Sequence, residues 1–451
     1  MGAALALATL GAIAIPSVAA ETGEPPYEQL TGTYVLEDGR LLIIWDVVDQ
    51  MPQNAHQLVV TEPASGWVRS LHPDDTSPFR FSAGPGWFVP TPREATLTFD
   101  QHDSKPAHSV QWTLEGDVAV GERAPLRRRS LSIESGDVVL AGELVLPPES
   151  VAQPPYPGLL MIPGFGPLTR NTPRYVADQY AMAGIAVLIH DKRGAGESTG
   201  RWVPGAVPDF ARDAEAALAV LREQPDVDPG RVGVMASSLG GMTAALLHEK
   251  DPDWAFFVCR VCPTVPHWET KLASIPQQGR AAGLPPGEIL DALARQVLAD
   301  RYAVTRENYE ALASVEETTR TDEWRNRIGH PSDWPPVMPA ESSAWDGYAA
   351  VLGADPQQLY RNIQAPLLVI LGEYDHELPG HYHASRLRWA LEQSGHQHHE
   401  IRVLPKASHG LMETEFDESG QRRPFRRFVP GWHQAMVEWV VQQVGDVSAG
   451  D

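Results

Sequence analysis

The sequence contains only two cysteines, Cys259 and Cys262, in 451 residues. Two cysteines cannot form a disulfide framework or a cysteine-rich zinc site, so the fold must be stabilised by packing. Both lie in the apolar stretch 256–262, which predicts a buried strand. On a strand, an offset of three directs two side chains to opposite faces, so we expect two separate buried thiols.

Basic charge is also scarce. Lys and Arg number 36 against 58 Asp and Glu, which gives a formal net charge of -22. A field of this sign repels phosphate backbones and anionic membrane surfaces, and it argues against nucleic-acid binding.

After residue 20 there is no apolar run long enough to span a membrane. Residues 2–20 are uncharged and mostly Ala, Leu and Ile, and Pro16 precedes the small residues 18–20. This pattern predicts a cleaved signal peptide, residues 1–20, and a secreted or periplasmic protein with no stable membrane insertion after cleavage. Because no Lys or Arg precedes the run, a membrane anchor or an incomplete leader is the alternative.

Length and a hydrophobic content of 43% predict two to three folded domains. Residues 21–128 are interpreted as an N-terminal β-rich domain that packs against or covers the next one, and the basic run 127–129 as an exposed linker. The domain is too short for a four-bladed propeller. Its candidate strands are 34–36, 41–45, 96–99 and 109–114.

From residue 131 onward strands alternate with helices, which predicts an α/β domain, residues 129–451, with a mostly parallel sheet. A tryptophan-rich helical stretch at about 266–358 interrupts the alternation and is interpreted as a lid; it contains Trp268, Trp324, Trp334 and Trp345. The eight candidate strands are 131–133, 138–146, 158–162, 185–190, 232–235, 256–261, 367–371 and 401–404. The candidate helices are 175–182, 209–221, 239–248, 384–393 and 432–444.

Small residues surround a serine where the strand 232–235 gives way to a helix. Ser238 has Ala236 two positions before it and Gly240 two positions after it, the spacing of a nucleophile elbow. Such a turn lifts the hydroxyl above the sheet edge, where Ser238 would act as the nucleophile. A serine that only caps the helix is the alternative.

Two further polar residues follow strand ends. Asp375 comes shortly after the strand 367–371, and His409 lies in a loop after the strand 401–404. The chain order Ser238, Asp375, His409 is that of a serine triad on a sheet of this kind. We expect His409 to act as general base and Asp375 to fix its tautomer.

The loop after the strand 158–162 contains Gly164, Phe165 and Gly166. Its glycines permit close approach to a substrate. The Phe165 amide, together with that of Leu239, would form an oxyanion hole.

These motifs resemble the α/β-hydrolase superfamily, and within it the bacterial serine aminopeptidases, cinnamoyl esterases and acyl-thioesterase-related hydrolases. The similar segments are residues 164–167, 190–198, 372–375 with Pro379, the Ser238 elbow and 409–410. The resemblance covers residues 130–445 and implies an eight-stranded α/β-hydrolase sheet with a helical lid. In the segment 190–198 we expect Asp191 and Arg193 to organise the loop and His190 to be packed.

The sequence therefore predicts an exported serine hydrolase that cleaves small-molecule carboxylic esters through an acyl-enzyme, without metal or cofactor. A serine aminopeptidase or an acyl thioesterase with the same triad is the alternative. In the aminopeptidase, Glu269, Glu373 or Glu377 would hold the substrate ammonium. A non-catalytic binding protein that kept the fold is the third hypothesis.

Overall fold

A computed structural model describes residues 27–47, 56–87, 89–100, 106–203, 205–328, 337–416, 423 and 425–445. The predicted signal peptide and Trp334 lie outside these residues. Among the described residues, no helix is long and apolar enough to cross a membrane.

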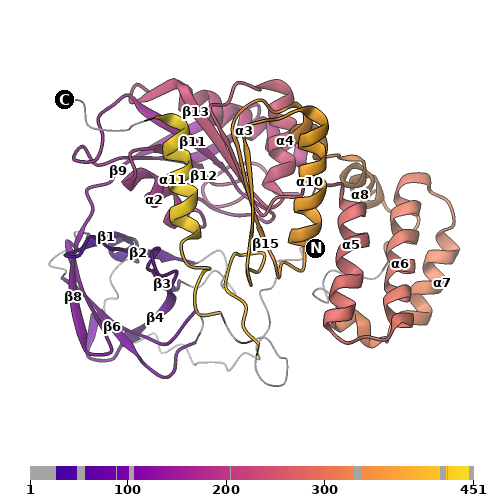
Figure 1. The fold of residues 1–451 in the computed structure, drawn as a ribbon, viewed down its shortest axis with the longest axis horizontal. Coiled ribbons are helices and arrows are strands. Elements are labelled where there is room, and N and C mark those ends of the chain that lie inside the picture. Colours follow the sequence, from indigo (N-terminus) through magenta and orange to yellow (C-terminus); the bar gives the residue numbers. More distant parts are fainter. Residues whose placement is uncertain are drawn as a thin grey trace.

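The N-terminal part is a closed antiparallel barrel of eight strands, because β8 pairs back onto β1 (Figure 1). Its interior is apolar and includes Tyr34, Leu97 and Phe99. A short helix, α1 (Tyr27–Leu30), precedes it. The strands are β1 (Gly32–Leu36), β2 (Leu41–Asp46), β3 (Leu58–Thr61), β4 (Val68–Asp74), β5 (Ser77–Ala83), β6 (Ala95–Asp100), β7 (Ser109–Leu114) and β8 (Asp117–Arg123).

The C-terminal part has an eight-stranded, mostly parallel sheet, as predicted, and its strands lie in the order β16-β15-β14-β13-β11-β12-β10-β9. The pairings of β10 with β9 and with β12 are antiparallel, and the others are parallel. The strands are β9 (Arg127–Ser135), β10 (Val138–Leu146), β11 (Tyr156–Ile162), β12 (Ala186–His190), β13 (Val227–Ser237), β14 (Phe257–Arg260), β15 (Leu367–Gly372) and β16 (His399–Leu404).

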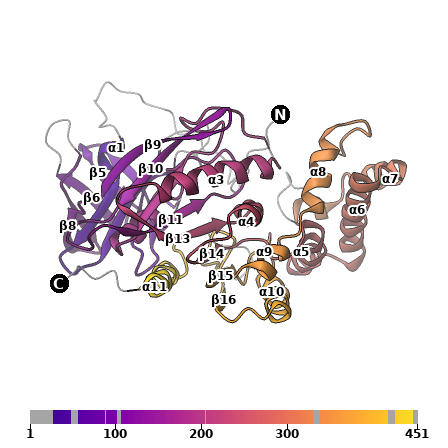
Figure 2. The same ribbon diagram turned by 90° about the horizontal axis from the view of Figure 1, so that it is seen from above.

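Every residue of β11 and of β15 is buried, as expected for central strands covered on both faces. Helices α3 (Val207–Arg222), α4 (Gly240–Lys250) and α10 (Gly380–Ser394) cover one face. Helices α2 (Arg174–Met182) and α11 (Trp432–Val444) cover the other. Figure 2 shows α11 on the side of the sheet away from α3. The buried residues of α3 recur at spacings of three and four, which gives one apolar stripe against the sheet.

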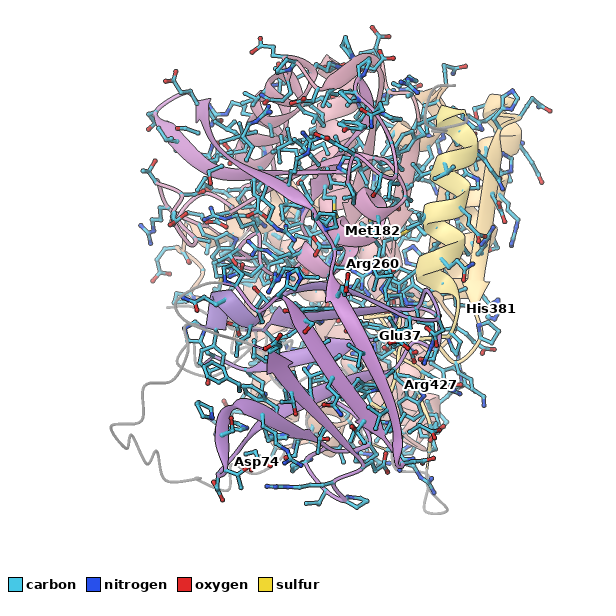
Figure 3. All side chains as sticks on the ribbon, turned by 90° about the vertical axis from the view of Figure 1, so that its left-hand side faces the viewer. Glu37, Asp74, Met182, Arg260, His381 and Arg427 are labelled. Atoms are coloured by element: carbon cyan, nitrogen blue, oxygen red, sulfur yellow. The ribbon has the colours of Figure 1, made fainter. Side chains whose placement is uncertain are left out.

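The barrel packs on the α2 and α11 face of the sheet. Trp45 of β2 stacks on Tyr175 of α2 at 4.5 Å between ring centroids, and Thr33 donates a 2.8 Å hydrogen bond to Asp178. Figure 3 views this junction from the barrel side, with Glu37 and Asp74 on the barrel and Met182 and Arg260 in the α/β part. One continuous apolar cluster includes residues of both parts, so the barrel shields this face of the α/β domain.

A helical insertion separates β14 from β15. It contains α5 (His267–Ala281), α6 (Pro286–Thr305), α7 (Tyr309–Thr319), a 3-10 helix (Glu323–Asn326) and α8 (Ala344–Gly353), and α9 (Gln357–Asn362) follows it. Trp324 and Trp345 are buried in the two apolar cores of the insertion itself, while Trp268 is exposed. Two of its tryptophans therefore stabilise the insertion internally.

The interpretation of residues 127–129 as an exposed linker is wrong. These arginines begin β9, and Arg128 binds Asp178 and Glu143 while Arg129 binds Asp226. Arginines can occupy this strand because carboxylates on neighbouring elements neutralise their charge. These ion pairs join residues that are distant in sequence, so the local sequence does not reveal them. The division proposed at residues 128 and 129 falls inside this strand.

The expectation that the two cysteines point to opposite faces is also wrong. The strand ends at Arg260, and Val261 has a φ of 46°, so the alternation of side chains stops before Cys262. Cys259 and Cys262 are both free, and both lie in the apolar cluster on the same face of the sheet.

Candidate active site

Ser238 lies at the sharp turn between β13 and α4. Its φ of 50° is in the left-handed region, which is strained for a serine and characteristic of a nucleophile elbow. Its backbone N–H donates to Arg260 O of the neighbouring strand at 3.0 Å. The turn is therefore anchored to the sheet, with the hydroxyl above its edge.

Glycine at position 240 lets the start of α4 approach the end of β11. A Cβ atom there would lie 2.7 Å from Ile162 O and 2.9 Å from Pro163 O, closer than carbon and oxygen atoms pack. A side chain at 240 would thus displace either the elbow or the loop that begins at Pro163.

His409 lies in the loop that follows β16, next to Ser238. Its Nε2 is 2.9 Å from Ser238 Oγ. The loop is held from two sides, because Arg260 donates to Gly410 O at 3.2 Å and Ser408 N donates to Met412 O at 2.9 Å. The imidazole therefore has a defined position, with its side chain 19% exposed.

Asp375 follows β15 and is completely buried. Its Oδ2 is 2.7 Å from His409 Nδ1, and its Oδ1 accepts hydrogen bonds from the backbone N–H groups of Glu377 and Leu378, each at 2.9 Å. Both carboxylate oxygens are occupied, which fixes the orientation of the carboxylate and so of the imidazole. The structure thus joins the three predicted residues, distant in sequence, in one hydrogen-bonded series.

A fourth ionisable group, Glu377, lies beside this series. Its Oε2 is 3.6 Å from His409 Nε2, and within the described residues it has no Lys or Arg partner. Burial acts to lower the pKa of His409, but the negative charges of Asp375 and Glu377 outweigh it and raise that pKa to about 9.

The predicted oxyanion donors flank the serine. Leu239 directly precedes α4, so its amide belongs to the N-terminal end of the helix dipole. Gly164 lies against the elbow, since a Cβ atom on it would be 3.3 Å from Ser238 Cβ. Across the described residues, neither the Phe165 amide nor the Leu239 amide donates to another protein group, which leaves both open to a ligand oxygen.

The other two acidic candidates have partners of their own. Glu269 accepts hydrogen bonds from Tyr382 and Arg386, and Glu373 accepts one from the Lys406 backbone N–H at 2.8 Å. Of the three glutamates considered from the sequence, only Glu377 contacts the triad, through His409 Nε2.

The segment 190–198 braces the loop at 163–170. Asp191 accepts hydrogen bonds from the backbone and the guanidinium of Arg170, at 2.7 and 3.0 Å, and Arg193 forms a bidentate pair with Asp213. His190 is buried, as predicted for a packed residue. Sequence reasoning missed Lys192, whose Nζ donates to Gly164 O at 2.8 Å. The only feature of the sequence that could have identified Lys192 is its position between Asp191 and Arg193, to which structural roles had been assigned.

The arrangement can generate an oxygen nucleophile without a bound cofactor. Neutral His409 can accept the Ser238 proton on Nε2 while Asp375 stabilises the resulting imidazolium. No group of three or more His, Cys, Asp or Glu side chains in the described part of the chain could hold a metal ion.

The chain is similar to known hydrolases. The family model of the X-Pro dipeptidyl-peptidases (S15 family) matches residues 135–400. The bifunctional esterase/perhydrolase DCH of Acinetobacter calcoaceticus is 26% identical over 208 residues, which cover 44% of this chain and 66% of that protein. The thiohydrolase aneE of Aspergillus aculeatus is 34% identical over 91 residues, which cover 20% of this chain and 28% of that protein. The chain thus matches less than two thirds of the length of either relative.

Among solved structures, proline iminopeptidase from Mycobacterium smegmatis is similar with a TM-score of 0.42 and 16% identity, covering 70% of this chain and 99% of that one. A thermophilic esterase from Thermogutta terrifontis gives a TM-score of 0.39 and 18% identity, covering 70% of this chain and 100% of that one. The family model matches more than half of the 451 residues, from the hairpin of β9 and β10 to the last strand of the sheet. The chain therefore belongs to the X-Pro dipeptidyl-peptidase (S15) family, with an α/β-hydrolase-like sheet.

Proposed function

We propose that this protein hydrolyses carboxylic esters of small molecules through an acyl-enzyme formed on Ser238. The observation that carries the proposal is the hydrogen-bonded series from Asp375 through His409 to Ser238 Oγ. A serine, an imidazole and a buried carboxylate in this order are the requirements for nucleophilic acyl transfer.

The reaction proceeds in two halves. Ser238 Oγ attacks the ester carbonyl as its proton moves to His409 Nε2, and the Phe165 and Leu239 amides donate to the oxyanion. His409 then gives the proton to the leaving alcohol, and the acyl group stays on Ser238. In the second half a water molecule attacks the acyl-enzyme with the same proton transfers, which releases the acid and restores the serine.

A fluorophosphonate probe and a panel of short p-nitrophenyl esters test the proposal. We expect stoichiometric labelling of Ser238, located by peptide mass spectrometry, and ester turnover that disappears in proportion to labelling. Heat-unfolded protein serves as the control, because labelling must depend on the folded site. A folded protein that neither labels nor turns over esters would favour a non-catalytic binding role and refute the proposal.

A peptidase acting on amino termini is the second candidate, favoured by the S15 family match and by the partly exposed Glu377 carboxylate beside His409. A carboxylate in this place would bind a substrate ammonium. Parallel measurement of aminoacyl and Xaa-Pro p-nitroanilides against simple esters separates the two. We expect the esters to have the higher kcat/KM, and a clear preference for an anilide would reverse the assignment. Acyl thioesters complete the panel, because two relatives are named as thiohydrolases.

We also expect activity to rise from neutral to alkaline pH. His409 must be neutral to accept the Ser238 proton, and its pKa is raised to about 9, so kcat/KM should reach half of its maximum near that pH. In Glu377→Gln one of the two raising charges is lost, so the midpoint should move to lower pH and kcat/KM at neutral pH should increase.

Profiles of kcat/KM against pH for the wild type and Glu377→Gln measure this shift. Glu392→Gln is the matched control, since Glu392 is an exposed glutamate in α10. An unmoved midpoint in Glu377→Gln would show that the Glu377 charge does not act on His409.

Export is part of the proposal and is supported only by the composition of residues 1–20. N-terminal sequencing of the protein from the periplasm or medium of a bacterial host tests it. The expected first residue is Glu21, and intact protein confined to the cytoplasm would contradict export.

A further inference from the structure

The mechanism above leaves one buried cation unexplained. Lys192 is 4% exposed and follows β12 by two residues. Its Nζ donates to Gly164 O at 2.8 Å and lies 4.1 Å from the centroid of the Phe210 ring. Burial of an ammonium group costs free energy unless hydrogen bonds or opposite charges compensate it. We therefore expect a buried lysine in this place to have a function.

We propose that Lys192 is a positioning residue of the oxyanion hole, which holds and polarises the peptide unit whose N–H belongs to Phe165. The inference rests on the proposed function, because it assigns that amide to the oxyanion. It concerns a residue that does not touch the substrate itself.

The covalent geometry of the peptide unit carries the argument. Gly164 C=O and Phe165 N–H belong to one planar peptide group, and this bond is not among the cis bonds of the described chain. In a trans peptide the C=O and the N–H point in opposite directions. When Lys192 fixes the Gly164 oxygen, it therefore also fixes the direction of the Phe165 N–H, on the side away from the ammonium.

The loop that carries this peptide unit lies directly on the nucleophile. A Cβ atom at Gly164 would be 3.2 Å from Ser237 O and 3.3 Å from Ser238 Cβ. A small rotation of the peptide unit would move the amide relative to Ser238 Oγ, the place where the oxyanion forms. Displacements of this size are enough to reduce a rate strongly.

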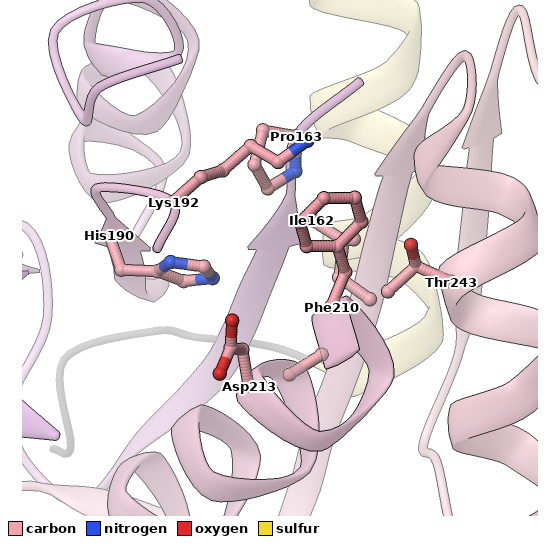
Figure 4. Close-up of a pocket in the computed structure, with 8 residues that line it drawn as sticks. Ile162, Pro163, His190, Lys192, Phe210, Asp213 and Thr243 are labelled. Atoms are coloured by element: carbon pink, nitrogen blue, oxygen red, sulfur yellow. The ribbon is translucent and has the colours of Figure 1, made fainter. Parts of the chain in front are cut away.

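The surroundings of Lys192 favour a role in the protein interior. Figure 4 shows its side chain extending toward Pro163, with His190 and Asp213 on the other side of a small cavity. The cavity measures about 10 Å³, the room needed for one water molecule, so a substrate cannot enter it. Lys192 therefore acts on the reaction through the peptide unit.

Lys192 is itself held in place. Its backbone N–H donates to Leu168 O at 3.1 Å, which ties it to the same loop a second time. Burial lowers the pKa of the Lys192 ammonium to about 8, although the nearby Asp213 charge opposes this. The cationic form therefore predominates at neutral pH and is lost over the alkaline range in which His409 becomes neutral, while the hydrogen bond to Gly164 O can persist in both forms. A positive charge on the acceptor side draws electron density toward Gly164 O and makes the Phe165 N–H a stronger donor. A neutral amine would still donate the hydrogen bond, with less polarisation.

The experiment compares Lys192→Met with the wild type on an ester and on the matching thionoester. Sulfur is a weak hydrogen-bond acceptor, so a thionoester gains little from the oxyanion donors. Loss of one such donor costs roughly 100- to 1000-fold in kcat, and loss of its positioning group should cost less, about 10- to 100-fold. We expect this loss in kcat for the ester, a nearly unchanged KM, and only a small change for the thionoester.

Control variants distinguish the expected effect on the oxyanion hole from a general loss of folding. Lys250→Met removes an exposed lysine of α4 and should leave both substrates unaffected. Lys192→Arg keeps a cationic donor and should recover part of the activity. Lys192→Gln is the second variant if Lys192→Met does not fold, because its amide can still donate but carries no charge.

An equal loss for ester and thionoester, or no loss for either, would overturn the inference. An arginine variant as impaired as Lys192→Met, with the same loss on both substrates, would assign Lys192 to general packing and overturn it as well. Failure of the proposed function has a different signature, because the wild-type protein would then neither hydrolyse the ester nor react with the fluorophosphonate.

Discussion

Replacement of Ser238 by alanine is expected to lower kcat/KM for p-nitrophenyl esters by about three to six orders of magnitude, the range found when a serine triad loses its nucleophile. Alanine removes the oxygen that forms the acyl-enzyme and leaves His409 without a group to deprotonate. Residual hydrolysis would come from water activated by His409 and from the oxyanion donors. Initial rates and fluorophosphonate labelling measure the effect.

The neighbouring serine provides the control for this prediction. Ser237 is the last residue of β13 and pairs in register with Arg260 of β14, and the hydrogen bond to His409 Nε2 is made by Ser238 and not by Ser237. Ser237→Ala should therefore retain most of the activity and all of the labelling. Full turnover in Ser238→Ala, or a loss confined to Ser237→Ala, would refute the assigned nucleophile.

Replacement of Asp375 by asparagine is expected to lower kcat by about four orders of magnitude with little change in the fold. Oδ1 of Asp375 accepts two backbone N–H groups, from Glu377 and Leu378. Asparagine must keep its oxygen toward those donors, because its NH₂ group would oppose them. The NH₂ group then faces His409 Nδ1, which must become an acceptor, and the proton moves to Nε2. In that tautomer Nε2 cannot accept the Ser238 proton.

Kinetics and thermal unfolding of Asp375→Asn test this reasoning together. Asp291→Asn, an isosteric change at an exposed site in α6, is the control and should be neutral. A value of kcat within tenfold of the wild type would show that the carboxylate does not set the tautomer of His409.

The elements of the sheet could be predicted because the apolar pattern reports burial directly. Continuous apolar runs such as 158–162 and 367–371 are the central strands β11 and β15, and the periodic segment 209–221 lies within α3. The barrel was harder to predict. Strands β3, β4, β5 and β8 were not predicted. For β8 the reason is that most of its residues are exposed. Its pairing with β1, which closes the barrel, joins segments that are far apart in sequence.

The two errors have different causes. The expectation for Cys262 extended the alternation of a strand beyond Arg260, where the backbone of Val261 turns into the left-handed region. The linker at 127–129 was inferred from charge alone, although Asp178 and Asp226 on other elements neutralise two of its arginines. The first error arises from the local backbone conformation, and the second from ion-pair partners that lie far away in sequence.

The sequence alone was enough to predict the alternation of strands and helices in the α/β part, the elbow at Ser238 and the positions of Asp375 and His409 after strand ends, because local pattern and strand polarity suffice for these. Only the tertiary structure decided that His409 Nε2 lies 2.9 Å from Ser238 Oγ, that Glu377 faces the same nitrogen, and that Lys192 holds the peptide group before Phe165. These contacts depend on distances between loops from different strands, and such distances arise only when the sheet brings the loops together.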